Sequence, residues 1–278
     1  MKKSLLCLGV GASFGAPALE QIKLFKRIGF DGFFTAYDEH IKEYRGLADA
    51  LSLLYQSVHA PFSHSAKLWQ GGEEAEVGVE RLLSCVRDCA ENAVPVMVCH
   101  TYIGFEPSEG PTPVGIENYG KVVEAAAEYG VKIAFENTEG EEYLAALMKA
   151  FSSYRNVGFC LDTGHELCYN KGKDMLALYG DRLFATHIHD NLGVSSPDGK
   201  IFWTDDLHLL PFDGIKDWED TARRVKACGF DGPLTFELVR TSKPDRHEND
   251  AYGAMPLEAY LALAYERAVR FRALLDKQ

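Results

Sequence analysis

The sequence predicts a single α/β domain over residues 1–278, folded as a closed (β/α)8 TIM barrel. Three observations support this fold class. Eight short apolar segments alternate with amphipathic ones, a glycine-containing junction recurs between them, and the length suits a barrel, which occupies about 250 residues. An open doubly wound sheet is the alternative. The segment 9–15 lacks the glycine spacing of a nucleotide-binding loop and has no ribose-binding acid, which favours the barrel.

The expected strands follow one another along the whole chain. They occupy residues 4–10, 32–36, 55–60, 94–100, 131–137, 157–162, 183–190 and 233–238. The first follows a basic start that imitates a secretory signal, but we predict residues 5–10 to be a strand instead. Between strands, residues 73–92, 116–129 and 257–275 place apolar side chains at helical spacing, which predicts amphipathic helices.

Glycines mark the points where helices are expected to end. The junctions IGFDG at 28–32 and CGFDG at 228–232 are near copies, and YGVK at 129–132 is a looser third. A glycine in this position allows the left-handed backbone of a helix C-cap, after which the chain turns directly into a strand. Repetition of one junction indicates that one βα unit is used many times. No linker or low-complexity tract divides the chain.

Charge and cysteine content restrict the possible partners and location. The chain has 29 Lys and Arg residues against 41 Asp and Glu residues, a net charge of −12. Binding to nucleic acid depends on basic groups that replace counterions, so a nucleic-acid partner is disfavoured. No stretch reaches the roughly 18 apolar residues of a membrane span. The seven scattered cysteines include no CxxC motif and are predicted to be buried, reduced thiols of a cytoplasmic protein. The oligomeric state stays open, a homo-oligomer included.

Six of the eight expected strands end in ionisable residues. In a parallel barrel the carboxyl ends of the strands surround the site of chemistry, and an unpaired buried carboxylate costs several kcal/mol. Six such endings therefore indicate a polar cavity at the barrel mouth. Mixed oxygen and nitrogen donors without a thiol suit Mn²⁺, Zn²⁺, Co²⁺ or Mg²⁺. The residues concerned are His59, His100, Glu136, Asp162, the group His187, His189 and Asp190, and Glu237.

The order and context of these endings resemble the xylose isomerase-like superfamily of TIM barrels, which contains sugar isomerases, epimerases and endonuclease IV-type AP endonucleases. The matching segments are VHAPF at 58–62, FENT at 135–138, LDTGH at 161–165, HIHDN at 187–191, DLHLLP at 206–211 and FE at 236–237. The resemblance implies one divalent metal ion held by Glu136, Asp162, His187 and Glu237. His187 is preferred to His189 because the family's ligand stands three residues before the aspartate matched by Asp190.

The resemblance also implies a reaction. It predicts an isomerase or epimerase of a small ketose, hydroxy-ketoacid or sugar phosphate, with Glu136 and Glu237 as the acid/base pair. The proton would move through a metal-bound enediolate, in which the metal holds both oxygens and absorbs negative charge. Expected substrate contacts are His59, His100, His165, Asp206 and His208, together with Arg240, which follows Glu237 closely and could bind a substrate anion.

The main alternative hypothesis is an endonuclease IV-type AP endonuclease. Nine residues match the ligand positions of a three-metal nuclease: His59, His100, Glu136, Asp162, His165, His187, Asp206, His208 and Glu237. Loops that grip DNA should be basic, yet residues 11–20 and 107–117 contain no Lys or Arg, and Lys67 stands alone after His59. We therefore expect a carbohydrate partner. A related metal-dependent lyase or dehydratase and a non-catalytic sugar binder are further alternatives.

Overall fold

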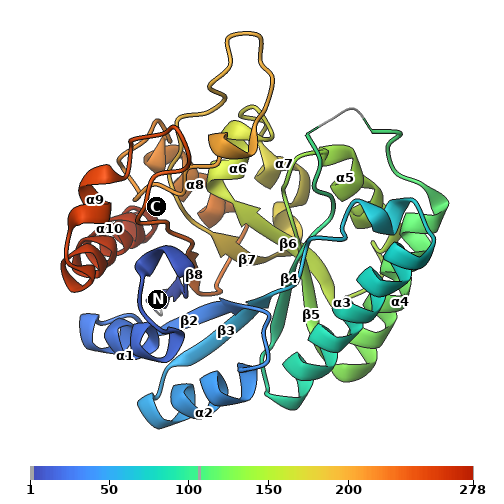
Figure 1. Cartoon of the computed structure of the whole chain (residues 1–278), viewed down its shortest axis with the longest axis horizontal. Coiled ribbons are helices and arrows are strands. Elements are labelled where there is room, and N and C mark those ends of the chain that lie inside the picture. The colour runs from blue at the N-terminus through green and yellow to red at the C-terminus, as the bar shows by residue number, and fades with distance from the viewer. Residues whose placement is uncertain (1–2, 106–107, 278) are drawn as a thin grey trace.

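The computed structural model describes residues 3–105 and 108–277 and shows a barrel of eight parallel strands ringed by helices (Figure 1). The strands are β1 (Leu6–Gly9), β2 (Gly32–Ala36), β3 (Leu54–His59), β4 (Val96–His100), β5 (Lys132–Glu136), β6 (Val157–Asp162), β7 (Leu183–His187) and β8 (Leu234–Phe236). Each pairs with its neighbours in chain order, and β1 pairs with β8. The barrel closes between β7 and β8 through a parallel bridge from Ile188 to Phe236. The predicted barrel is confirmed, and the open sheet is excluded.

Two sequence predictions extend beyond the described residues. Residues 1–2, 106–107 and 278 lie outside them, and with them the ends of the predicted domain 1–278 and the first residue of the acidic segment 107–117. The expected strand 183–190 ends earlier, at His187, and only single bridges continue beyond it.

The helices cover the outside of the barrel. They are α1 (Ala18–Ile28), α2 (Ile41–Leu51), α3 (Glu73–Glu91), α4 (Pro113–Tyr129), α5 (Glu141–Ala150), α6 (Thr163–Cys168), α7 (Met175–Tyr179), α8 (Trp218–Ala227), α9 (Asp250–Ala254) and α10 (Leu257–Lys277). The three predicted helices are confirmed. The one expected at 116–129 begins earlier because Thr112 caps it, accepting from Gly115 N–H at 3.2 Å, and Pro113 suits the first turn. Helix α10 contacts both α1 and α8 and so completes the ring.

The repeated junctions have the predicted backbone conformation. Gly29, Gly130 and Gly229 have φ values of 117°, 73° and 68°, in the left-handed region that glycine adopts without strain. After Gly29, the carboxylate of Asp31 accepts the N–H of Leu6 at 2.9 Å. This bond ties the α1–β2 junction to the start of β1, so the junction also helps to set the strand order.

The barrel interior positions the ionisable strand ends. A small apolar cluster of Val96, Val98, Ala134, Cys160 and Ala185 fills its centre. Alternate residues of a strand point to the same face, so the residues two positions further along also point inward, one layer nearer the carboxyl ends. Those residues are His100, Glu136, Asp162 and His187. Their inward orientation therefore follows from the same alternation that builds the core.

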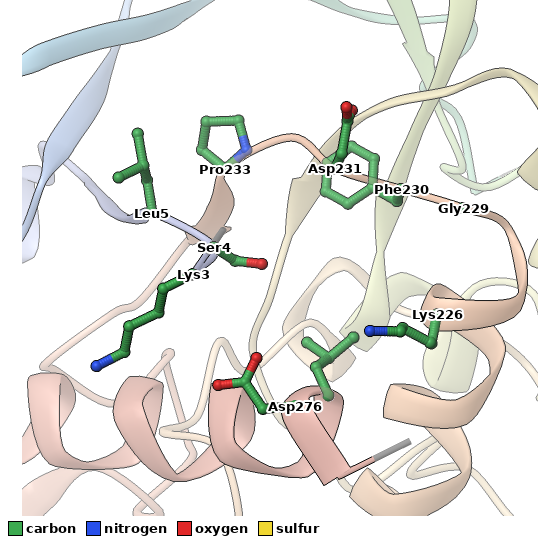
Figure 2. Close-up of a pocket in the computed structure, with 10 residues that line it drawn as sticks. Lys3, Ser4, Leu5, Lys226, Gly229, Phe230, Asp231, Pro233 and Asp276 are labelled. Atoms are coloured by element: carbon green, nitrogen blue, oxygen red, sulfur yellow. The ribbon is translucent and has the colours of Figure 1, made fainter. Parts of the chain in front are cut away.

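A separate cavity lies at the opposite end of the barrel. Figure 2 shows its lining, which comes from the segments that precede β1 and β8 and from the end of α10. It measures about 440 Å³ and includes Lys3, Lys226, Asp231 and Asp276. The amino-terminal end of such barrels serves stability. We therefore expect the chemistry at the carboxyl end, where the ionisable side chains gather.

The structure also bears on the predictions about the cysteines and about membrane spans. All seven cysteines are free, and six are buried, with Cys228 partly exposed. Burial raises the pKa of the Cys160 thiol well above its usual range, so this side chain behaves as a small apolar group. None of the described helices combines the length and apolar content that a membrane crossing requires.

Candidate metal and substrate site

The four predicted metal ligands lie together at the barrel mouth. Glu136, Asp162 and His187 end β5, β6 and β7, and Glu237 follows β8; one ligand atom of each lies within 4.8 Å of the others. His187 Nδ1 is 2.9 Å from Glu136 Oε1 and 3.2 Å from Glu237 Oε2. The first three residues are fully buried, whereas the Glu237 side chain is 25% exposed. Two carboxylates thus meet at one imidazole.

The electrostatics of this group favour a cation. Burial alone would raise the pKa of Glu136, but His187 and His100 hold it well below its usual range. Burial acts on Glu237 in the same way, and His187 and His208 lower its pKa. Burial would lower the pKa of His187, yet the two glutamates raise it well above its usual range. The carboxylates are therefore ionised, with a proton on His187 as the counter-charge.

The residues present fit a divalent metal ion. Among the described residues, Glu136 Oε2 and His187 Nε2 are buried and accept or donate no well-aligned hydrogen bond, although the Nε2 atoms of His59 and His100 lie 3.3 and 3.1 Å from Glu136 Oε2. A buried carboxylate oxygen without a well-aligned donor is unfavourable, and a bound cation would satisfy it. Because a histidine must be neutral to ligate a metal, binding would displace the His187 proton. The composition and spacing of the group are those of a divalent-metal site.

Asp162 is fixed by contacts that explain the motif Asp162-Thr163-Gly164-His165. It caps α6, accepting the His165 N–H at Oδ1 over 2.6 Å. His189 Nε2 lies 2.9 Å from Oδ1 and 3.0 Å from Oδ2 of the same carboxylate. A Cβ at Gly164 would lie 1.9 Å from the His189 ring, so only glycine admits that ring. His189 thus orients Asp162, while His187 belongs to the four-residue group.

Two asparagines also hold the strand ends, a role not predicted from the sequence. Asn137 accepts the N–H of Asp162 at 2.7 Å and donates to the Asp162 carbonyl at 2.9 Å. It also donates to Asn170 Oδ1 at 2.9 Å. These bonds fix the ends of β5 and β6 relative to each other, so the spacing between Glu136 and Asp162 is fixed too. The available signal was a polar residue directly after a predicted ligand.

A second group of metal-ligating side chains lies beside the first. It contains His165, Asp206 and His208, again with one ligand atom each within 4.8 Å of the others. Asp206 Oδ2 lies 2.6 Å from His208 Nε2 and 3.4 Å from His165 Nε2. Burial alone would raise the pKa of Asp206, but the two histidines hold it well below its usual range. The segment after β7 delivers Asp206 and His208, and an antiparallel bridge from Asp190 to Leu209 fixes it.

The remaining two predicted histidines adjoin Glu136. His59 and His187 form a third candidate group with it. His59 Nε2 lies 3.3 Å and His100 Nε2 3.1 Å from Glu136 Oε2. The Nδ1 of His59 is 2.9 Å from the Ala60 carbonyl, an interaction that directs Nε2 toward Glu136. The nine residues with ligand-type side chains predicted from the sequence therefore converge.

A cavity of about 330 Å³ opens over these groups. Its lining combines polar groups, including the exposed part of Glu237, with apolar and aromatic side chains. Phe34 stacks on His187 with ring centroids 4.8 Å apart, and Phe62 stacks on His100 at 4.7 Å. The lining residues are Val10, Phe34, Ala36, Tyr37, His59, Ala60, Pro61, Phe62, His100, His165, Asp206, His208, Glu237 and Lys243. The aromatic wall was not predicted, although Phe62 belongs to the VHAPF segment.

Arg240 is the one predicted site residue that the structure places elsewhere. Its guanidinium donates to the Met255 carbonyl at 3.1 Å, next to the start of α10. It is not among the described residues that line the cavity, whereas Lys243, three residues further on, is. A substrate contact by Arg240 stays a prediction.

Fold and site together define a class: (β/α)8 barrels with a buried carboxylate–imidazole centre at the carboxyl end of the strands. The chain belongs to the xylose isomerase-like TIM barrel family, whose model matches residues 22–259. This membership confirms the resemblance inferred from the strand-end motifs.

Individual relatives place the chain within this family. It is 36% identical over 151 residues to the uncharacterized protein y4fM of Sinorhizobium fredii, a match that spans 51% of this chain and 45% of that relative. The IOLI protein, solved with a zinc atom, has a TM-score of 0.75, 19% identity and 98% coverage of both chains. D-psicose 3-epimerase with D-tagatose, from Clostridium cellulolyticum H10, has a TM-score of 0.70 and 16% identity, covering 96% of this chain and 99% of its own. At these identities the structures show a shared fold.

Proposed function

We propose that the protein is a divalent-metal-dependent isomerase or epimerase of a small ketose, hydroxy-ketoacid or sugar phosphate. The observation that carries the proposal is the meeting of two carboxylates, Glu136 and Glu237, at His187 beneath a cavity of about 330 Å³. Such reactions remove a proton from the carbon next to a carbonyl and return it at another carbon or on the other face. The epimerase among the solved relatives supports this reaction class by analogy.

The two glutamates differ in their access to substrate. Glu237 lines the cavity, and we assign it the abstraction of the substrate proton. Glu136 is fully buried, but His59 and His100 stand between it and the cavity with their Nε2 atoms 3.3 and 3.1 Å from its carboxylate. We assign Glu136 the opposite acid/base role, exchanging its proton through these imidazoles. Both carboxylates have lowered pKa values, so the resting site holds them as bases.

The remaining residues bind and orient the substrate. A divalent ion held by Glu136, Asp162, His187 and Glu237 would supply Lewis acidity that stabilises negative charge on substrate oxygens. His165 and His208 line the cavity, and we assign them contacts with substrate hydroxyl groups. We assign Phe34 and Phe62, which also line the cavity, the exclusion of water from the reacting carbon. The cavity is of a size for a small carbohydrate.

Proton exchange in deuterated water tests the proposal. We expect the metal-loaded protein to introduce deuterium next to the carbonyl of at least one ketose in a panel, and Glu237→Gln to slow this about 100-fold or more. The matched control is Glu248→Gln, whose side chain is 24% exposed and pairs with Arg246 outside the centre. Metal content is measured in each variant. Equal exchange by Glu237→Gln removes Glu237 as the base, and no exchange by wild type with any ketose refutes the proposed function.

One observation favours a second candidate, the hydrolysis of a phosphodiester as in endonuclease IV-type enzymes. The group His165, Asp206 and His208 shares no residue with the four-residue group, and His59 forms a third group with Glu136 and His187. Elemental analysis distinguishes the candidates, because the isomerase proposal expects one bound ion per chain. Three ions together with cleavage of an abasic-site DNA duplex would support the nuclease instead.

A further inference from the structure

Lys243 brings a positive charge to the cavity. It follows β8 and lines the cavity together with Glu237 and His208. Among the described residues that form this lining, it is the only lysine or arginine. The ring of Trp203 lies 5.4 Å from its Nζ and supports the side chain on the outer side. Lys243 is therefore placed where it can meet a substrate without being buried beneath it.

The ammonium group of Lys243 forms no ion pair with a carboxylate among the described residues. It lies over the ring of Trp203 instead. Its basic neighbours differ: Arg246 pairs with Glu248 at 2.7 Å and lies 3.5 Å from Asp205, and the Arg240 guanidinium donates to a backbone carbonyl. Of Arg240, Lys243 and Arg246, only Lys243 is among the described residues that line the cavity.

The acidic residues of the cavity are held by other groups. Asp206 Oδ2 lies 2.6 Å from His208 Nε2, and Glu237 Oε2 lies 3.2 Å from His187 Nδ1. Both also belong to the candidate metal groups, where a bound ion would neutralise them further. Neither carboxylate is therefore engaged with Lys243, and its charge is available to an anionic ligand.

The backbone around Lys243 is ordered by hydrogen bonds. The Lys243 carbonyl accepts the N–H of Arg246 at 3.0 Å. Asn249 donates to the carbonyl of Val239 at 3.0 Å, and Ser242 donates to Asp250 at 2.6 Å. The base of the side chain is thus held in place, while its four-carbon stem lets the ammonium group adjust to a ligand.

We propose that Lys243 binds an anionic group of the substrate, a phosphate or a carboxylate, and makes the site selective for acidic over neutral carbohydrates. The inference rests on the proposed function in taking this cavity as the substrate site. Of the substrate classes considered above, it favours the sugar phosphate and the hydroxy-ketoacid over the neutral ketose. An ammonium group that binds a phosphate or carboxylate forms a charge-assisted hydrogen bond, which is stronger than a neutral one.

Calorimetric binding to the metal-loaded protein tests this selectivity without requiring turnover. The probes are D-fructose, D-fructose 6-phosphate and 2-keto-D-gluconate, which are neutral, phosphorylated and carboxylated. We expect wild type to prefer a charged probe, and Lys243→Met to weaken its binding about 10- to 100-fold while leaving D-fructose unchanged. Lys243→Arg should restore most of the preference. The tighter of the two charged probes identifies the group that is recognised.

The matched control is Lys67→Met, which removes an exposed lysine that pairs with Glu74 after β3. The inference is overturned if Lys243→Met keeps the wild-type preference, if Lys67→Met loses it equally, or if wild type binds the three probes alike. Its failure differs from failure of the proposed function. A protein that selects charged probes through Lys243 yet exchanges no deuterium would keep this inference and lose the isomerase proposal.

Discussion

At the scale of single residues, one side chain serves the fold and the site together. Asp162 ends β6, caps α6 through the His165 N–H and belongs to the candidate metal group. His189 contacts both of its carboxylate oxygens, and Gly164 is the residue that lets His189 do so. Outer contacts of this kind orient a ligand and tune its affinity for the metal. The glycine of the motif therefore supports the candidate metal group without touching it.

The prediction that follows concerns Gly164→Ala. The new methyl group would meet the His189 ring, displace it from Asp162 and weaken binding of Zn²⁺ or Mn²⁺ about 10- to 100-fold, as measured by calorimetry. Gly46→Ala in α2 is the control, because no atom lies within 4 Å of a Cβ there and the affinity should not change. Unchanged affinity in a folded Gly164→Ala variant would contradict the role assigned to His189.

At the scale of elements, the segments after β7 and β8 supply residues of the candidate site, as the ends of the strands do. The segment between β7 and α8 projects from the barrel in Figure 1 and then returns to place Asp206 and His208. The buried Asp190 fixes this return, since it accepts from Phe212 N–H at 3.0 Å, Lys216 N–H at 3.1 Å and the Trp218 indole at 2.9 Å. Its place in the HIHDN segment thus has a structural reason.

The same elements show which site residues could be predicted from the sequence and which could not. Strand ends such as Glu136 and Asp162 were predictable because alternation along a strand determines which side chains point inward. Loop positions lack that regularity. Arg240 and Lys243 are three residues apart and carry the same charge, yet only Lys243 lines the cavity. Phe34 could not be predicted as a cavity residue either, because nothing in the sequence distinguishes an apolar strand residue that faces a cavity from one that faces the core.

A buried ion cluster that joins α6 to α8 leads to a second prediction. Glu166 Oε1 and Oε2 each lie 2.9 Å from the Arg224 guanidinium, and Lys216 also bonds to Glu166. Although burial alone would raise the pKa of Glu166, Arg224 and Lys216 lower it. Glu166→Gln removes the carboxylate that Lys216 bonds to and leaves Arg224 with Asp174 and Asp220. We therefore expect a loss of about 3 kcal/mol in the free energy of unfolding at pH 7. Denaturant titration measures it.

The pH dependence of this loss has a definite sign. A carboxylate whose pKa is lower in the folded state than in the unfolded chain, where it is about 4.3, stabilises the fold at pH values above that unfolded-state pKa. Its contribution disappears as the pH falls toward the folded-state pKa. The difference between wild type and Glu166→Gln should therefore shrink below about pH 4. Glu117→Gln is the control, because Glu117 and Lys121 are exposed and their pair contributes less than about 1 kcal/mol. A difference independent of pH would refute the ionic origin.

At the scale of the whole molecule, the net charge of −12 is concentrated in part at one point. Glu136, Asp162, Asp206 and Glu237 come from separate strands and segments and meet at the barrel mouth. Mutual repulsion there opposes closure of the barrel, and the histidines between the carboxylates counter it, as the lowered pKa values of Glu136, Asp206 and Glu237 show. A bound divalent ion would link β5, β6, β7 and the residue after β8, which includes the junction where the strands close. Metal binding and barrel stability should therefore be coupled.

This coupling gives the last prediction. A ligand that binds only the folded state at 100 times its Kd stabilises by about 2.7 kcal/mol, which for a chain of this length raises Tm by several degrees. We expect Zn²⁺ or Mn²⁺ to raise the Tm of chelator-treated protein accordingly, and Asp162→Asn to abolish the response. Asp213→Asn, which removes a carboxylate that pairs with Arg267 outside the centre, should keep it. An equal response in both variants would show that the ion binds elsewhere, because Asp162 alone of the two belongs to the candidate centre.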